Sequence, residues 1–213
     1  MTGASFIYRG VRGSLSNLKG FEHGLEACMA NADLWLNESN ALYHLGSYGH
    51  CCALLVHGAE ALAQAYTCWI VIHGLEDPDS DEVKDIFKDH RPKTDILFGI
   101  LTSLMTLEKL LEARDEYPFQ LEYTDKELEK GYKEHSDSSH RFYRGLMDVR
   151  NQGIYVNLDS ETNQFSSPQD KKKGEANILS GLIFFIYAAI HRINNATEEE
   201  IKIIKQTYER LSR

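Results

Sequence analysis

Positive charge is in short supply in this chain of 213 residues. It has 23 Lys and Arg residues against 32 Asp and Glu residues, so its formal net charge is −9 at pH 7. A protein that coats nucleic acid needs a basic surface, because it binds by neutralising backbone phosphates. The charge balance therefore excludes a constitutive coat protein, but it leaves room for a local basic site.

Long apolar runs and targeting signals are also lacking. Residues 1–20 contain no apolar core of the length that a secretory signal requires. The longest apolar run covers residues 178–190, which is shorter than the ~20 residues that a helix needs to cross a bilayer. We therefore expect a soluble, cytoplasmic protein without membrane association, in which residues 178–190 belong to a buried core helix.

Cysteine and proline are both rare, with 4 residues of each. The scarcity of proline permits long helices, because proline breaks the helical hydrogen-bond pattern. The cysteines form no C-x-x-C pair of the kind that binds metal, and all of them fall in segments with a helical pattern. We expect buried, reduced thiols at these positions: Cys28, Cys51, Cys52 and Cys68.

Apolar residues recur at steps of three and four along most of the chain, which predicts an all-α fold. The expected helices cover residues 22–45, 48–73, 81–89, 92–115, 125–150, 171–194 and 198–211. Residues 1–20 are expected to be irregular, and residues 151–170 to form a short irregular or β-like arm after the fourth long helix. We interpret residues 1–213 as a single domain, an antiparallel up-and-down bundle of five to six helices.

A polar stripe runs along the second expected helix and includes His57, with Glu60 beside it. The stripe is either a solvated face or a functional seam within the bundle, and the sequence leaves both open. His57 and Glu60 are spaced i, i+3, as in di-metal carboxylate bundles, but in reversed order. The partial echo of this pattern is Asp137-x-x-His140. We therefore expect neither a metal site nor a cofactor.

Arg150 ends the fourth long helical pattern and projects near its apolar side. A buried guanidinium without acceptors is costly, so this side chain must find partners. It either caps the carbonyls at the end of its own helix, which the helix dipole favours, or holds a phosphate with its planar set of donors. Tyr155 follows within the β-prone run 154–156 and is either a site residue or a packing residue with a bound hydroxyl.

A second basic cluster lies at the expected start of the third long helix, where His90, Arg91 and Lys93 are close together. Backbone N–H groups at a helix N-terminus favour bound anions. The cluster is either a solvated turn or an anion-binding site shared with Arg150.

Three segments resemble, in register, the AbiV-like abortive-infection family. They are "MANADLWLNESNALYHLGSYGHCCALLVHGAEALAQAY", "FKDHRPKTDIL" with its His-x-x-Lys pattern, and "RNQGIYVNLDSETNQFSSPQD". The resemblance covers residues 22–195. This family belongs with the HEPN superfamily of helical bundles, many of which are RNA-cutting toxins of defence systems.

The HEPN signature is an arginine, often followed by an asparagine, and then a histidine four to six residues later. By resemblance, Arg150 and Asn151 take the first two places, and Tyr155 stands where the histidine is expected. The AbiV-like helix usually reads Glu-Glu-x-Gly-Lys. Here the same segment begins at Glu60 and reads Glu-Ala-Leu-Ala-Gln, so only the first acid is kept.

The resemblance implies a homodimer whose two signature arginines meet across a shared cleft. It also implies metal-independent RNA cleavage that arrests growth or translation in phage defence. Arg150 would stabilise the charge that develops on the phosphate, and Asn151 would orient the phosphate or the arginine. A phenol such as that of Tyr155 is a poor base at neutral pH, with an ordinary pKa of about 10. It could donate a proton to the leaving oxygen, while His90 is the first candidate base and His57 the second.

The remaining candidates, Lys93, Arg91 and Glu60, would take part in binding. Two alternatives stay open. One is a non-catalytic HEPN-like dimer that binds a phage protein or the translation machinery. The other is a metal- or ligand-binding bundle unrelated to defence. In the catalytic interpretation a phage protein could serve as the activator.

Overall fold

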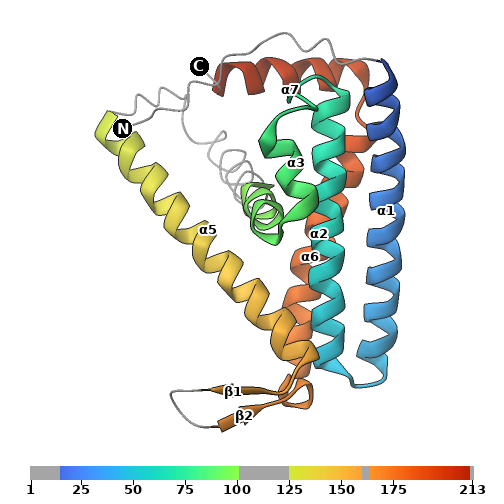
Figure 1. Ribbon diagram of the computed structural model, residues 1–213, viewed down its shortest axis with the longest axis vertical. Helices are drawn as coiled ribbons and strands as arrows, with labels where there is room; N and C mark the ends of the chain where they lie inside the picture. The colour runs from blue at the N-terminus through green and yellow to red at the C-terminus, as the bar shows by residue number, and fades with distance from the viewer. Residues whose placement is uncertain (1–14, 101–124, 160–163, 212–213) are drawn as a thin grey trace, which may run out of the picture.

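The computed structural model describes residues 15–100, 125–159 and 164–211. Figure 1 shows two long antiparallel helices side by side, with a third behind them and a fourth that meets the bundle at an angle. The all-α fold predicted from the sequence is confirmed. In chain order the elements are α1 (Leu15–His44), α2 (Tyr48–Ile72), α3 (Asp81–Lys88), a helix over residues 90–100, α5 (Asp125–Ile154), β1 (Asn157–Asp159), β2 (Gln164–Ser166), the 3-10 helix η1 (Pro168–Asp170), α6 (Lys173–Asn194) and α7 (Glu198–Leu211).

The helix α2 is the centre of the fold, because α1, α5 and α6 all pack against it. It is buried on nearly all sides, and its many small side chains allow the neighbouring helices to approach closely. These include Ala53, Ala59, Ala61, Ala63 and Ala65, all almost fully buried. A polar side chain that projects from such a helix is surrounded by protein, and Glu60 is accordingly buried.

The end of α5 is fixed on α2 by direct backbone contact. A Cβ on Gly153 would lie 2.4 Å from the carbonyl oxygen of Gly49. A Cβ on Gly49 would in turn lie 2.2 Å from the carbonyl oxygen of Pro168 in η1. Only glycine fits at such a distance, so these two positions set how closely α5, α2 and η1 meet.

The sequence prediction ended the fourth long helix at residue 150 and was wrong there. Helix α5 continues to Ile154, and the backbone N–H of Tyr155 still donates to the carbonyl of Asn151 at 2.9 Å. Gly153 lies within this last turn and is the contact that holds it against α2. The run 154–156 is therefore not a strand.

The β-like arm predicted for residues 151–170 is present, but it is shorter and begins later. Strand β1 pairs antiparallel with β2, with Leu158 opposite Phe165. At the other end of the chain, α1 begins at Leu15 and includes Gly20, so the prediction of irregular structure up to residue 20 was wrong from residue 15 onward. A glycine within an exposed helical turn costs only ~1 kcal/mol, which a long packed helix absorbs. Residues 1–14 lie outside the described part, as do residues 101–115 of the expected third long helix.

Helix α6 was expected to be a buried core helix, and this is correct for only one of its faces. The buried face lies against the bundle and consists of residues spaced by three and four: Ala176, Leu179, Ile183, Ile186 and Ile190. The opposite face exposes Ile178, Phe184 and Phe185, which are 77%, 65% and 45% exposed. The apolar run is continuous because both faces of the helix are apolar.

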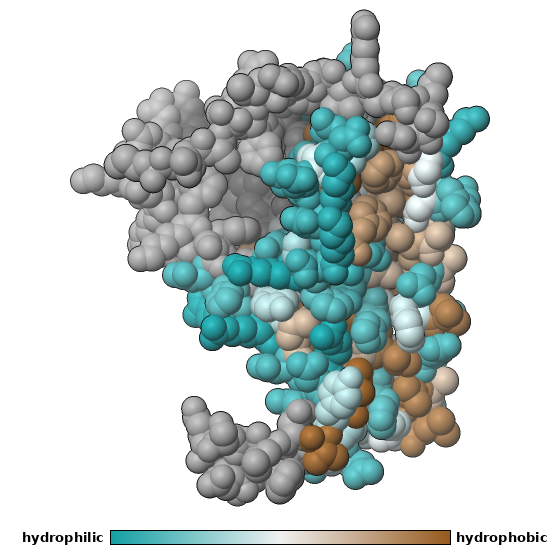
Figure 2. Space-filling view, viewed as in Figure 1, coloured by the Kyte–Doolittle hydropathy of each residue, from teal (hydrophilic) through white to brown (hydrophobic). Residues whose placement is uncertain are grey.

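By length and composition, α6 is also long and apolar enough to cross a membrane, with a mean hydropathy of 1.5 over its most apolar window, of which 28% is buried. The cysteines are free, and Cys51, Cys52 and Cys68 are buried while Cys28 is partly exposed. Figure 2 shows that hydrophilic side chains dominate the face over α2 and α3, whereas hydrophobic ones gather along the edge formed by α1.

Candidate functional site

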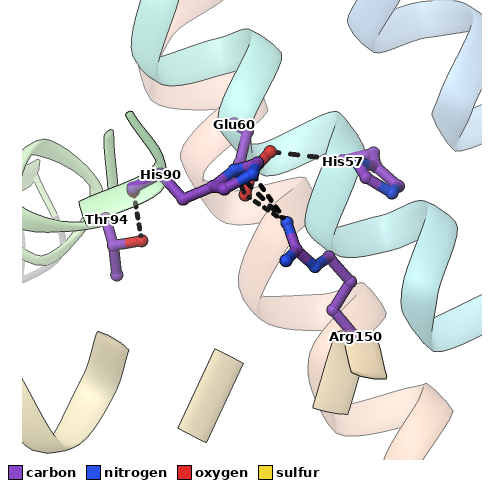
Figure 3. Close-up of polar contacts among 5 residues, drawn as sticks. All are labelled: His57, Glu60, His90, Thr94 and Arg150. Atoms are coloured by element: carbon purple, nitrogen blue, oxygen red, sulfur yellow. Dashed lines mark hydrogen bonds and ion pairs between the residues drawn. The ribbon is translucent and has the colours of Figure 1, made fainter. Parts of the chain in front are cut away.

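Three residues that are far apart in the sequence meet between three helices. Glu60 projects from the middle of α2, His90 is the first residue of the helix over residues 90–100, and Arg150 lies in the last turns of α5. Figure 3 shows their side chains converging on the carboxylate of Glu60, with His57 on its other side. One of the two sequence alternatives placed His90 in an anion-binding site shared with Arg150, and the structure brings these two side chains together.

The contacts define a chain of polar groups. The Nδ1 atom of His90 lies 2.7 Å from Oε1 of Glu60. The Nη1 atom of Arg150 lies 3.1 Å from Nε2 and 3.3 Å from Nδ1 of His90. The same Nη1 atom lies 3.6 Å from Oε1 of Glu60.

These distances assign the tautomer of His90. An ionised carboxylate only accepts hydrogen bonds, so at 2.7 Å the Nδ1 atom of His90 must carry the proton and donate it to Glu60. In the neutral ring, Nε2 then keeps its lone pair. Because Nη1 of Arg150 is almost equally far from Nε2 and Nδ1, it lies beside the ring between the two nitrogens and not in line with this lone pair.

Burial decreases from Glu60 outward. The side chain of Glu60 is 8% exposed, that of Arg150 18% and that of His90 44%. The carboxylate therefore lies at the floor of the cluster, and the imidazole lies at its solvent-facing rim. A group that binds from solvent would meet His90 first and Arg150 behind it.

The carboxyl group of Glu60 is held in its charged form. Burial by itself raises the pKa of Glu60, but the hydrogen bond of His57 and the electrostatic attraction of His90 and Lys93 outweigh it, so the pKa is lowered from its ordinary value. The Nδ1 atom of His57 lies 3.8 Å from Oε2 of Glu60. Both carboxylate oxygens thus face positive or hydrogen-bond-donating groups.

The position of His90 depends on how α3 ends. Asp89 has an extended backbone, with φ −113° and ψ 149°, and separates α3 from the next helix. Val83 and Ile86 bury the inner face of α3 and anchor it on the bundle. The next helix then begins at His90, and the hydroxyl of Thr94 donates to the carbonyl of His90 at 3.0 Å. Thr94 is fully buried and was not singled out from the sequence, although its i+4 spacing from His90 was a signal.

The other predicted site residues lie around this cluster. Lys93 is buried, with 8% exposure, and adds positive charge near Glu60. The side chain of Arg91 is exposed, and Asn151 is half-buried next to Arg150. Tyr155 is 59% exposed and lies just beyond the end of α5. Since residues five apart on a helix point ~140° from each other, Tyr155 and Arg150 occupy different sides of the helix end.

The guanidinium of Arg150 finds its partners outside its own helix. Its guanidinium contacts side chains on two other helices rather than the carbonyls of its own helix end. The acceptor that the buried position demands is supplied by Glu60 and by the neutral ring of His90. This places a permanent cation beside His90, behind the rim of the site.

The same geometry bears on the metal alternative. Within the described ranges, no group of three or more His, Cys, Asp or Glu side chains is arranged to hold a metal ion. The Nη1 atom of Arg150 lies 3.6 Å from Glu60, so a cation already accompanies this carboxylate. Of the partial echo on α5, Asp137 is exposed, and Nδ1 of His140 is buried without a hydrogen-bond partner among the described residues.

A comparison with protein families gives a match over most of the chain. The HEPN_AbiV family model, described as AbiV, matches residues 21–179. No curated protein and no solved structure matches the chain. The matched range runs from α1 into α6 and includes every residue of the cluster. It confirms the resemblance drawn from the three sequence segments.

Proposed function

The chain belongs to the AbiV family of HEPN proteins, and from this premise we propose that it is an abortive-infection protein of phage defence that arrests growth or translation by cutting RNA. The proposed cleavage needs no metal ion and takes place at a cleft between two copies of the chain. The observation that carries the proposal is the contact of Arg150 with His90. A permanent cation and a proton acceptor, 60 residues apart in the sequence, lie 3.1 Å from each other.

The two side chains match the two requirements of the reaction. The RNA 2′-oxygen attacks the adjacent phosphorus and loses its proton to Nε2 of His90. The bond between phosphorus and the 5′-oxygen breaks, and the leaving oxygen takes up a proton from water. The products are a 2′,3′-cyclic phosphate and a 5′-hydroxyl. Arg150 lowers the barrier because its fixed positive charge faces the negative charge that develops on the phosphate.

We assign the proton transfer to His90 rather than to Tyr155. Imidazoles as a class accept protons near neutral pH, whereas phenols are poor bases there. His90 also contacts Arg150 directly, while Tyr155 is 59% exposed beyond the end of α5. In this proposal His90 does the work of the signature histidine from another helix.

Arg91 and Asn151 are proposed to guide the RNA backbone to the site, and the buried Lys93 to add positive charge behind it. Arg91 is exposed at the same helix N-terminus as His90, where backbone N–H groups also favour phosphate. The chain as a whole has a net charge of −9, so the attraction for RNA has to be local. We propose that the protein acts in the cytoplasm as a homodimer, with a phage protein as a possible activator.

The test follows RNA integrity and growth in cells that express the protein. Arg150→Ala is expected to abolish both RNA cleavage and growth arrest. The matched control is Arg141→Ala. Arg141 lies on the same helix but is exposed, and its Nη2 donates a hydrogen bond to Oγ of Ser138 at 3.3 Å. Equal RNA cleavage by Arg150→Ala and by the wild-type protein would contradict the proposal.

The second candidate function is a non-catalytic dimer that binds a phage protein or the translation machinery. The exposed apolar side chains of α6, Ile178, Phe184 and Phe185, favour this candidate, since such a surface is suited to a protein partner. Growth arrest that persists in Arg150→Ala cells, with RNA intact in both strains, would support the binder.

A further inference from the structure

We infer that Glu60 is a positioning residue: its carboxylate keeps the proton of His90 on Nδ1, so that Nε2 remains a proton acceptor facing Arg150. The structural part of this inference stands on the contacts alone. Its catalytic consequence rests on the proposed function.

The geometry is that of a carboxylate that orients an imidazole. Glu60 Oε1 accepts from His90 at 2.7 Å, the shortest contact within the cluster. Glu60 is 6% exposed, so water does not compete for this oxygen. A free imidazole exchanges its proton between the two nitrogens, and an acceptor fixed beside one of them selects a single tautomer.

The position of Glu60 is itself fixed. Glu60 projects from the most buried helix of the fold, and its second oxygen faces His57 at 3.8 Å. The ring of His57 packs on Trp35 of α1, with ring centroids 5.4 Å apart. His57 therefore supports the carboxylate from behind, which gives this candidate base a different place in the cluster from that of His90.

The arrangement also explains how the resting site would respond to a phosphate. Without substrate, Nη1 of Arg150 lies 3.1 Å from Nε2 of His90. A guanidinium is attracted more strongly to a charged phosphate than to a neutral imidazole, because both partners are then charged. An incoming phosphate would therefore draw Arg150 toward itself, with the lone pair of Nε2 beside the reacting group.

The same carboxylate limits the motion of Arg150. Nη1 of Arg150 is 3.6 Å from Oε1 of Glu60, so the guanidinium keeps one anionic neighbour as it turns toward a phosphate. Glu60 thus aligns both reacting side chains from the floor of the site. This assigns a role to the first acid of the Glu-Ala-Leu-Ala-Gln segment.

The test reads the tautomer of His90 directly, by nitrogen NMR of the full-length protein with labelled histidine. Spectra are recorded at about pH 8.5, where an ordinary imidazole with a pKa of ~6.5 is neutral. The signals of His90 are identified by their absence from His90→Gln. Protonated and unprotonated ring nitrogens have well-separated shifts, so the two tautomers are distinguished without any RNA.

The wild-type protein is expected to show His90 with Nδ1 protonated and Nε2 unprotonated. Glu60→Leu, which removes both carboxylate oxygens at similar volume, is expected to move the proton largely to Nε2. Glu60→Gln is expected to give a mixture, because one acceptor oxygen remains. The control Glu38→Gln changes an exposed carboxylate of α1 and should leave the His90 spectrum as in the wild type. Should Glu60→Leu fail to fold, Glu60→Gln carries the test.

Two results overturn the inference: protonation of Nε2 in the wild-type protein, or an unchanged Nδ1 tautomer in Glu60→Leu. In a parallel RNA assay, Glu60→Leu is expected to lose cleavage on the order of 100-fold or more, as when a positioning carboxylate is removed from a histidine base. If the tautomer of His90 depends on Glu60 but the wild-type protein does not cut RNA, the proposed nuclease activity is refuted and the positioning role of Glu60 is supported. If the tautomer switches in Glu60→Leu but this variant cuts RNA at the wild-type rate, the tautomer of His90 does not matter for cleavage. That result would refute the catalytic role inferred for Glu60.

Discussion

Gly153 near the end of α5 rests directly on Gly49 at the start of α2, so closely that a Cβ on Gly153 would lie 2.4 Å from the carbonyl oxygen of Gly49. This contact lies one helical turn from Arg150 and sets the distance between α5 and α2. Since Glu60 is on α2, the same contact determines how far the guanidinium of Arg150 has to reach. The site is thus built on a backbone contact between two glycines.

Replacing Gly153 by alanine is expected to push α5 away from α2. Overpacking of this kind typically costs ~1–3 kcal/mol in the free energy of unfolding. The control is Gly145→Ala on the same helix, where a Cβ would meet nothing within 4 Å. That change should stabilise the protein by up to ~1 kcal/mol, because alanine is the better helix former. Urea unfolding of both variants measures the change in the free energy of unfolding, which should be negative for Gly153→Ala and positive for Gly145→Ala. An increase in stability for Gly153→Ala would contradict the described contact.

The charge of Glu60 is expected to stabilise the fold in a pH-dependent way. Because its pKa in the folded protein is lowered from 4.5, its contribution is fully present above that value and is lost as the pH falls through the folded pKa. The groups that face it are His57, His90, Lys93 and Arg150. Glu60→Gln should lower the free energy of unfolding by ~1–3 kcal/mol near neutral pH, the usual range for a charged hydrogen bond.

Denaturant titrations of the wild-type protein and Glu60→Gln, repeated from neutral to acidic pH, check this prediction. The difference between the two proteins should narrow below pH 4.5. A difference that grows as the solution is acidified would show that the carboxyl group is not held in its charged form.

His90 and Tyr155 compete for the role of the signature histidine, and their variants separate the two assignments. His90→Gln removes the proposed proton acceptor and should reduce RNA cleavage by ~10²–10⁴-fold, the usual contribution of a general base. Tyr155→Phe, which removes one hydroxyl group, should reduce cleavage by less than about tenfold, far below that range. Rates are compared on the same RNA in single-turnover assays, and the reverse order would return the role to Tyr155.

The two faces of α6 are distinguished by a matched pair of isoleucines. Ile183 is 1% exposed and Ile178 is 77% exposed. Ile183→Ala should therefore lower the free energy of unfolding by ~2–5 kcal/mol, because it leaves a cavity in the core. Ile178→Ala should change it by no more than ~0.5 kcal/mol, as expected for a surface position. Thermal unfolding of the two variants compares their losses of stability. Equal losses would mean that both faces of α6 are buried in the folded protein.

The helices were predictable because their apolar residues repeat with helical spacing, as the buried face of α6 illustrates. The exposed apolar face of α6 was missed, since a continuous apolar run gives no sign of which half faces solvent. The end of α5 was missed for a different reason. Gly153 has the same local signature whether it breaks a helix or serves as a contact point, and only the neighbouring Gly49 decides between the two.

The sequence singled out candidate residues for the site but not their arrangement. Arg150 and His90 were identified because each is a charged or titratable side chain near an expected helix end. The link through Glu60 depends on α2 lying between the other two helices, which is a property of the packing. The position of His57 likewise depends on packing, because its ring lies against Trp35 of α1 and so stays beside Glu60, away from the rim of the site.

The central claim is that the Arg150–His90 pair cuts RNA without a metal ion, and the most direct measurement is the chemistry of the RNA ends. Purified wild-type protein, Arg150→Ala and Arg141→Ala are incubated with RNA in excess chelator, and the ends are identified by their reactivity to phosphatase and kinase. The account predicts 2′,3′-cyclic phosphate and 5′-hydroxyl ends from the wild-type protein and Arg141→Ala, and intact RNA with Arg150→Ala. Cleavage that stops with the chelator, that leaves 5′-phosphate ends, or that persists in Arg150→Ala would contradict it.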